Sequence, residues 1–123
     1  MTTFTDEPYL SLETYRRDGT PMRTPVWFVR HGDRLYVRTV AESGKVKRLR
    51  RNPHVRIALC DRVGNVTGSW VAATGREVRD DAALYARVDQ LLDEKYGEIK
   101  RQLAAQAVAE GCRYTILEIQ LDD

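Results

Sequence analysis

Residues 34–53 read RLYVRTVAESGKVKRLRRNP, and the spacing of their apolar positions changes once along the stretch. The first seven alternate and are rich in β-branched and aromatic types, which predicts a strand. Ser43 can then cap a short helix in which Val46 and Leu49 share one face. Asn52 ends this helix, because a residue that precedes proline avoids the α region. We expect this strand and the short basic helix after it to be the local unit on which the fold is built.

The flanking sequence predicts further strands and two longer helices. Together with 34–40, the strands are expected at residues 8–16, 22–30, 54–61, 67–79 and 112–121. Gly68 and Gly75 are candidate bulge or bend positions in the fifth strand. Helices are expected at 80–96 and 98–110, with Gly111 as a C-cap. Six antiparallel strands with inserted helices predict a mainly β (α+β) small barrel, with two helices before the last strand.

Composition limits the class of protein. The chain has 123 residues, 42% of them hydrophobic and 31% charged, which is typical of one globular domain spanning residues 1–123. No apolar run is long enough to cross a membrane, and the first ten residues do not have the pattern of a secretory signal. Cys60 and Cys112 match no zinc or redox spacing, so we expect a cytoplasmic protein with reduced thiols and no metal site.

Charge is distributed unevenly along the chain. Residues 1–62 hold 13 lysines and arginines and 7 aspartates and glutamates, a net charge of +6, whereas residues 63–123 hold 7 and 11, a net charge of −4. Five of the cations lie between Lys45 and Arg51. This stretch predicts an anionic partner.

No catalytic side chain stands out. The glycine-rich nucleotide motifs GxGxxG and GxxxxGK[ST] are absent, as is the hydrolase motif GxSxG. His31 and His54 are expected at the surface, and Asp80-Asp81 is typical of a helix start. We therefore name no nucleophile, general base or other catalytic residue.

Two segments carry features of a binding site. The start of the basic helix offers unpaired amides beside Ser43 and Lys45, which suits a phosphate, although a solvated basic face explains the same run equally well. Pro25, inside a predicted strand, indicates an edge that could present backbone groups to a flat heterocycle. Trp27 and Trp70 could stack on such a ring, or simply pack in the core.

These segments together resemble the split β-barrel family of pyridoxamine-phosphate-oxidase-like flavin and deazaflavin oxidoreductases, and in particular its actinobacterial branch that uses coenzyme F420. The matching pattern is Gly19-x-Pro21-x-x-Thr24-Pro25-Val26-Trp27-Phe28, then Leu35-Tyr36-Val37-x-Thr39, then Ser43-Gly44-Lys45-Val46-Lys47-x-Leu49-Arg50-x-Asn52-Pro53. The resemblance implies a split barrel whose cofactor lies in a groove between two subunits of a homodimer.

The resemblance also implies which residues contact the cofactor. Those implied are Thr39, Ser43 and Lys45 at the phosphate with Val46, Lys47 and Arg48 beside them, then Pro25, Val26 and Trp27 at the ring system and Trp70 closing the site. Flavin mononucleotide (FMN) users of the family usually carry Arg where this chain has Thr24, and often Arg-Lys where it has Gly44-Lys45. Fewer cations at those points favour the deazaflavin, whose polyglutamate tail suits cations spread along a helix.

The activity implied is therefore an F420-dependent reductase that transfers hydride to a small or flat conjugated acceptor, with the chemistry residing in the cofactor. The same fold is compatible with an FMN-dependent oxidoreductase or with a non-catalytic F420 binder or carrier. A nucleic-acid-binding barrel is a remoter alternative, because the cations gather on one short helix instead of spreading across strands. The sequence does not identify the acceptor.

Overall fold

The computed structural model describes residue 4 and residues 7–79, 81–109 and 114–122. In these parts of the chain the elements are β1 (Leu10–Tyr15), β2 (Pro21–Val26), β3 (Val29–His31), β4 (Arg34–Val40), α1 (Gly44–Arg51), β5 (His54–Leu59), β6 (Val71–Val78), α2 (Ala82–Ala109) and β7 (Tyr114–Leu121). The strands form one sheet in the order β2-β1-β5-β6-β7-β4-β3, and every neighbouring pair is antiparallel.

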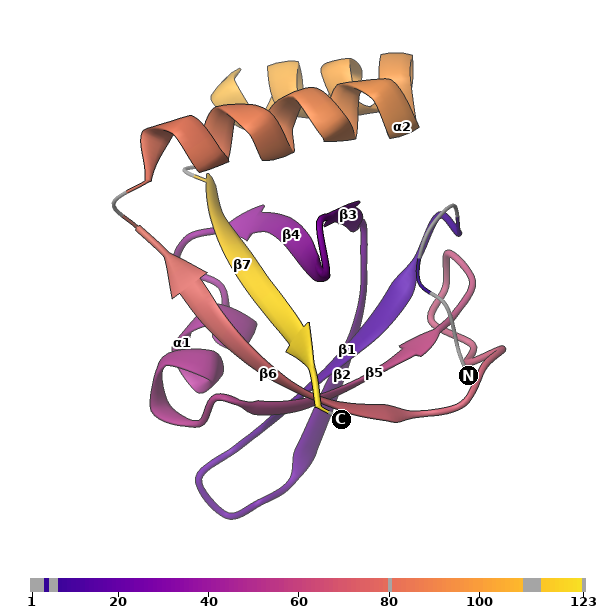
Figure 1. Cartoon of the computed structure of the whole chain (residues 1–123), viewed down its shortest axis with the longest axis vertical. Coiled ribbons are helices and arrows are strands. Elements are labelled where there is room, and N and C mark those ends of the chain that lie inside the picture. Colours follow the sequence, from indigo (N-terminus) through magenta and orange to yellow (C-terminus); the bar gives the residue numbers. More distant parts are fainter. Residues whose placement is uncertain (1–3, 5–6, 80, 110–113, 123) are drawn as a thin grey trace.

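The two edges of the sheet are joined by a very short link. The edge strands are β2 and β3, and only Trp27 and Phe28 separate them in the chain. A sheet whose opposite edges are two residues apart has to roll up, so the strands form a barrel that stays open along the seam between β2 and β3 (Figure 1). Phe28 is fully buried at this seam. The prediction of a mainly β antiparallel barrel is confirmed.

The inside of the barrel is apolar. Its buried residues alternate along the strands, as expected when one face of each strand points inward. They are Phe4, Leu10, Leu12, Val26, Phe28, Leu35, Val37, Val46, Leu49, Val55, Ile57, Ala73, Leu117 and Ile119. Because β1, β4, β5 and β7 all contribute to this one core, any side chain next to these positions in the sequence points to the outer face.

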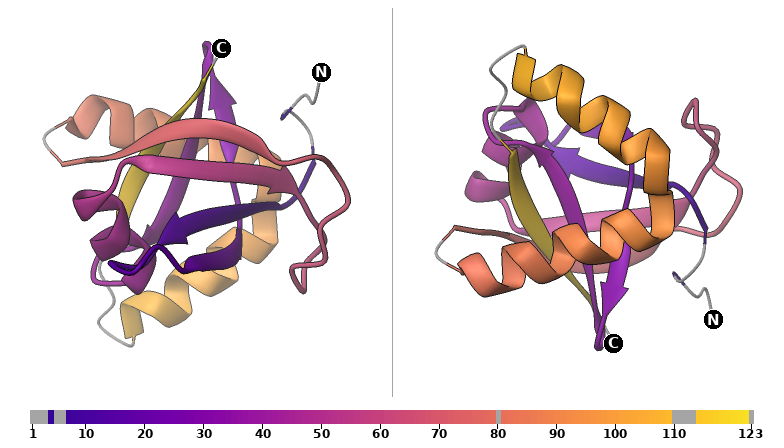
Figure 2. Two further views of the ribbon diagram at one scale, coloured as in Figure 1. Left: turned by 90° about the horizontal axis from the view of Figure 1, so that it is seen from below. Right: turned by 90° about the horizontal axis from the view of Figure 1, so that it is seen from above.

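Helix α1 lies against one end of the barrel (Figure 2). Its apolar side is Val46 and Leu49, both buried, which is the pair that the sequence predicts. Gly75 allows the close approach to β6, because a Cβ atom there would lie 3.0 Å from Leu49 Cδ1. Its amide also donates to the Pro53 carbonyl. At Gly75, α1 therefore packs closely on β6, and the strand continues without a break from Val71 to Val78.

Helix α2 covers the part of the outer face formed by β3, β4 and the neighbouring end of β7. Val88 and Leu92 pack with Val29, Tyr36 and Ile116. Its two arms meet at an angle in the view from above (Figure 2) because Gly97 has a φ of 57°, outside the helical region. The predicted helices over 80–96 and 98–110 are these two arms. In the described part of the chain, no helix has the length and apolar character needed to cross a bilayer.

The strands predicted over 8–16 and 54–61 are shorter, Leu10–Tyr15 and His54–Leu59, and three further predicted strands differ in ways that bear on the sheet. The strand expected over 22–30 is two strands, because residues 27–28 pass from one sheet edge to the other, so the sheet has seven strands in place of six. The strand expected over 67–79 starts at Val71, and the amides of Thr67 and Gly68 instead both donate to the carbonyl of Leu59, the last residue of β5. The last strand begins at Tyr114, and Gly111 and Cys112 lie outside the described residues.

Candidate functional site

The start of α1 carries an unsatisfied hydroxyl. Ser43 is the N-cap, with extended backbone angles, but its side chain forms no capping hydrogen bond. Its Oγ is buried and has no partner among the described residues. The first-turn amides of a helix also have no partner within the helix. Thr39, near the end of β4, is 7% exposed. The Ser43 amide donates to the carbonyl of Val40, the last residue of β4, and this hydrogen bond holds the start of α1 next to that strand.

Among the residues that the structure describes, no carboxylate compensates the cations beside this cap. Lys45 and Arg48 are half-buried, and neither forms an ion pair with another described residue. Burial lowers the pKa of Lys45, and the charge of Arg48 lowers it further. Burial also lowers the pKa of Arg48, with added repulsion from Arg16 and Arg51. An anion bound at this end of α1 would relieve both effects.

Gly44 leaves room that Arg48 fills. A Cβ atom on Gly44 would lie 2.7 Å from Arg48 Nη1, so the guanidinium folds back over the first turn of the helix. Arg48 is held there because its Nε donates to Thr14 Oγ1, at 2.8 Å. Arg48 therefore brings a guanidinium to the point where a side chain on residue 44 would begin.

The remaining members of the basic run have different surroundings. Lys47 is exposed. Arg50 is paired with Glu77, and Arg51 donates to the Tyr15 carbonyl. The Val46 side chain is buried in the barrel core, which leaves only its main chain to contact a ligand. The structure thus brings Ser43, Lys45 and Arg48 together at one end of the barrel.

The predicted ring-lining residues lie at the other end of β1 and β2. Val26 pairs with Leu10, whereas Arg48 of α1 contacts Thr14 of β1, four residues or on the order of 13 Å away. The prediction from Pro25 that this strand lies at an edge is confirmed. The Val26 side chain belongs to the barrel core. Trp27 stacks on Tyr96 of α2, with ring centroids 4.3 Å apart, so part of its surface is already covered.

Tyr96 fixes the seam of the barrel. Its hydroxyl accepts a hydrogen bond from the Phe28 amide and lies within bonding distance of the carbonyls of Pro8 and Phe28. Lys95 also donates to the Phe28 carbonyl, at 2.8 Å. Burial raises the pKa of Tyr96 to about 12, so the hydroxyl remains protonated and able to donate. The backbone groups of the seam are therefore held by α2.

Trp70 lies apart from α1. Its ring packs against the guanidinium groups of Arg23 and Arg56, which are on the outer face of β2 and β5. Arg48 of α1 contacts Thr14, which is next to Glu13 on β1, and adjacent strand residues point to opposite faces. Since Glu13 binds Arg23 and Arg56, Trp70 and the α1 cations are on opposite faces of β1 within one chain.

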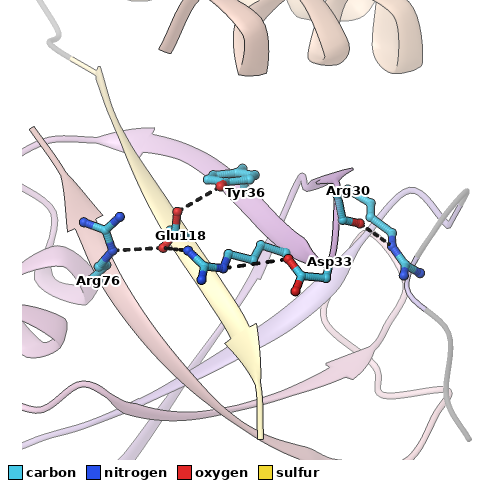
Figure 3. A network of polar contacts seen from close by, with 7 residues as sticks. Arg30, Asp33, Tyr36, Arg76 and Glu118 are labelled. Carbon is cyan, nitrogen blue, oxygen red and sulfur yellow. Dashed lines mark hydrogen bonds and ion pairs between the residues drawn. The ribbon is translucent and has the colours of Figure 1, made fainter. Parts of the chain in front are cut away.

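The sequence reasoning missed three buried carboxylates. Glu13 and Glu118 are each bonded to two arginines and one tyrosine, and Glu77 to Arg50 and Arg79. Burial raises the pKa of Glu13, but hydrogen bonds from its partners outweigh this and hold the pKa at about 2. Figure 3 shows the group around Glu118, where burial and the bond to Glu118 raise the pKa of Tyr36 to about 12.

An open concavity of about 500 Å³ lies where β6 meets α2. It is lined by Val78, Arg79, Asp81, Ala82 and Tyr85. None of the predicted site residues lines it. Its carboxylate caps α2, because Asp81 Oδ1 accepts a hydrogen bond from the Leu84 amide.

Comparison with known proteins identifies the fold and the family of the chain. No curated protein matches the chain. Among solved structures, it resembles the heme storage protein HutZ from Vibrio cholerae (TM-score 0.72, 20% identity, covering 96% of this chain and 84% of that one). It also resembles a FAD-binding protein from Mesorhizobium loti (0.62, 15%, 97% and 82%) and an F420 reductase (0.56, 18%, 96% and 90%). A family model described as pyridoxamine 5'-phosphate oxidase matches residues 1–122, so the chain belongs to the pyridoxamine 5'-phosphate oxidase family.

Proposed function

We propose that the protein binds coenzyme F420 and acts as an F420-dependent oxidoreductase on a small or flat conjugated acceptor. One observation supports this most directly: the buried Ser43 hydroxyl has no partner among the described residues and lies beside cations that no described carboxylate neutralises. A buried polar group without a partner is unfavourable, and an anion at this point would satisfy it.

Different residues would bind the phosphate, the anionic tail and the ring system of the cofactor. Ser43, Lys45 and Arg48, with Thr39 behind them, are placed to bind the phosphate, and Lys47 and Arg51 to bind a longer anionic tail. The main chain of β2 at Pro25 and Val26 would line the ring system. When bound, the deazaflavin supplies the hydride chemistry, while the chain binds, orients and shields the reacting ring.

A homodimer is part of this proposal. The phosphate end and the ring end of the site lie at opposite ends of β1 and β2 in a single chain. A second copy would supply a wall common to both ends, as the family resemblance implies. Trp70 lies on the opposite face of β1 from α1 within one chain, so we do not include it in the site of that chain.

FMN is the second candidate. It is favoured by the position of Arg48, whose guanidinium takes the place that an Arg side chain at position 44 would take. A phosphate clamp of one serine, one lysine and one arginine suits either cofactor. The number of cations beyond the clamp favours the deazaflavin, because FMN has no tail for them to bind.

The test is a fluorescence titration of the purified protein with F420 and, in parallel, with FMN. We expect tight F420 binding, weaker FMN binding, and at least a tenfold loss of F420 affinity in Lys45→Glu. Arg87→Glu makes the same change in charge on the exposed side of α2 and should leave the dissociation constant unchanged. Binding of FMN alone would indicate that the protein is an FMN-dependent oxidoreductase. Binding of neither cofactor would contradict the proposal and favour the nucleic-acid alternative.

A further inference from the structure

A second group of cations lies on the outer face of β1, β2 and β5. Its centre is Glu13, whose side chain is fully buried (0% exposed) although it points away from the barrel core. We name Glu13, Tyr15, Arg23, Arg56 and Trp70 the Glu13 cluster. No residue of this cluster belongs to the proposed phosphate site.

The carboxylate of Glu13 holds both arginines in place. Arg23 donates from Nε, at 2.8 Å, and Arg56 donates from Nε and Nη2, at 2.6 and 3.1 Å. The Tyr15 hydroxyl adds a fourth hydrogen bond, at 2.6 Å. Four donors saturate the two carboxylate oxygens. Glu13 therefore holds the two guanidinium groups in position.

Both arginine side chains are partly exposed. Arg23 donates to Glu13 through Nε alone, and no hydrogen bond joins its two Nη atoms to another described residue. Arg56 donates through Nε and Nη2 and also interacts with the Tyr15 hydroxyl. Their side chains are 53% and 43% exposed. Two guanidinium charges against one carboxylate leave the cluster with a net charge of +1.

Trp70 adds a flat apolar surface next to these donors. Its ring centroid is 4.9 Å from Cζ of Arg23 and 5.3 Å from Cζ of Arg56. The indole is partly exposed. An arginine pair beside an aromatic ring is suited to a ligand that has both a flat ring and an anionic group.

A chemically similar group in the same barrel differs in charge. Around Glu118, the donors are Tyr36 Oη, Arg76 Nε and Arg34 Nη1 (Figure 3). Asp33 lies 3.9 Å from Arg34, which brings the net charge of this group to zero. No aromatic ring comparable to Trp70 stacks on its arginines among the described residues. It serves as a matched comparison.

We propose that Arg23, Arg56 and Trp70 form a binding site for a planar organic monoanion, an aromatic carboxylate. The carboxylate accepts hydrogen bonds from the outward Nη atoms, and the ring of the ligand lies against the indole. One negative charge balances the net charge of the Glu13 cluster. This site goes beyond the proposed cofactor site, and within one chain the two lie on opposite faces of β1.

The experiment is a calorimetric titration of the full chain with 2-naphthoate in a low-salt, phosphate-free buffer, with tryptophan fluorescence recorded in parallel. We expect saturable binding, about tenfold weaker in Arg23→Gln and in Arg56→Gln, because each loses charge-assisted hydrogen bonds. Arg76→Gln, the matched change in the Glu118 group, should bind like the wild type. Trp70→Leu should weaken binding and abolish most of the fluorescence change.

Further measurements distinguish the contributions of the ligand's charge, its aromatic ring and the geometry of the guanidinium group. Neutral 2-naphthalenemethanol should bind at least tenfold more weakly, and inorganic phosphate should compete poorly. Arg23→Lys retains the charge without the planar fork and should fall between wild type and Arg23→Gln. Equal affinity for the neutral compound, equal weakening by Arg76→Gln, or competition by phosphate as strong as naphthoate binding would each overturn the proposal. Displacement of naphthoate by F420 would show one shared site, and would overturn the separation of the two.

Discussion

The cations of α1 and the arginines of the outer face differ in what lies opposite them. Lys45 and Arg48 face each other and a buried hydroxyl, whereas Arg23 and Arg56 face the buried carboxylate of Glu13. Charges that are paired inside the chain stabilise the fold. Charges that repel one another lower its stability, so they are more readily explained by a ligand than by the fold. Glu13 thus neutralises part of the charge of the outer-face arginines within the chain, whereas no described carboxylate pairs with Lys45 or Arg48.

Removing the carboxylate of Glu13 is the strongest test of the difference between the two groups of cations. Glu13→Gln leaves two guanidinium groups facing each other above a buried amide that cannot neutralise them. We expect the free energy of unfolding to fall by about 3 kcal/mol, the range for breaking a buried pair. Urea denaturation measures it, with Glu94→Gln, an exposed glutamate on α2, as the control. A loss below about 1 kcal/mol would mean that solvent supports the arginines as well as Glu13 does.

The dependence of stability on pH is expected to show how much the paired carboxylates contribute to the fold. The pKa of Glu13 and that of Glu77 are lowered from 4.5 to about 2 by their arginine partners. Because the folded-state pKa is lowered, the stabilisation is complete above pH 4.5 and is lost as the pH falls toward 2. Unfolding measured at pH 5, 4, 3 and 2 should therefore show a steady loss of stability. The curve of Glu13→Gln should be flatter, and parallel curves would exclude Glu13 as a source.

Sequence patterns predicted the α1 region better than the outer face, and locality explains the difference. The start of α1 at Ser43 and its end at Asn52 depend on neighbours within a few residues, and both are confirmed. The partners of Glu13 lie 10 and 43 residues away, so nothing near Glu13 signals that it is paired. The break at Trp27 and Phe28 was missed because strand-like residues continue across it, and only the order of the strands shows that the chain changes edges there.

Gly75→Ala tests how closely α1 must pack to hold its cations in place. The added Cβ would lie 3.0 Å from Leu49 Cδ1, which pushes α1 away from β6. We expect a loss of about 1–2 kcal/mol in the free energy of unfolding, typical of overpacking. Adding Leu49→Val should restore part of the loss by removing a methylene at the contact. If the double variant is no more stable than Gly75→Ala, the contact with Leu49 is not the cause.

Among these variants, we expect Lys45→Met to change stability least and to weaken cofactor binding most. Lys45 and Arg48 are like charges three residues apart on one helix, an arrangement that destabilises a helix by about 0.2–0.5 kcal/mol. Lys45→Met removes that repulsion and keeps most of the apolar stem. Urea denaturation should therefore show unchanged or slightly higher stability, while F420 affinity falls. A clear loss of stability would mean that Lys45 supports the fold, as Arg23 does, and would remove the contrast on which the proposed phosphate site depends.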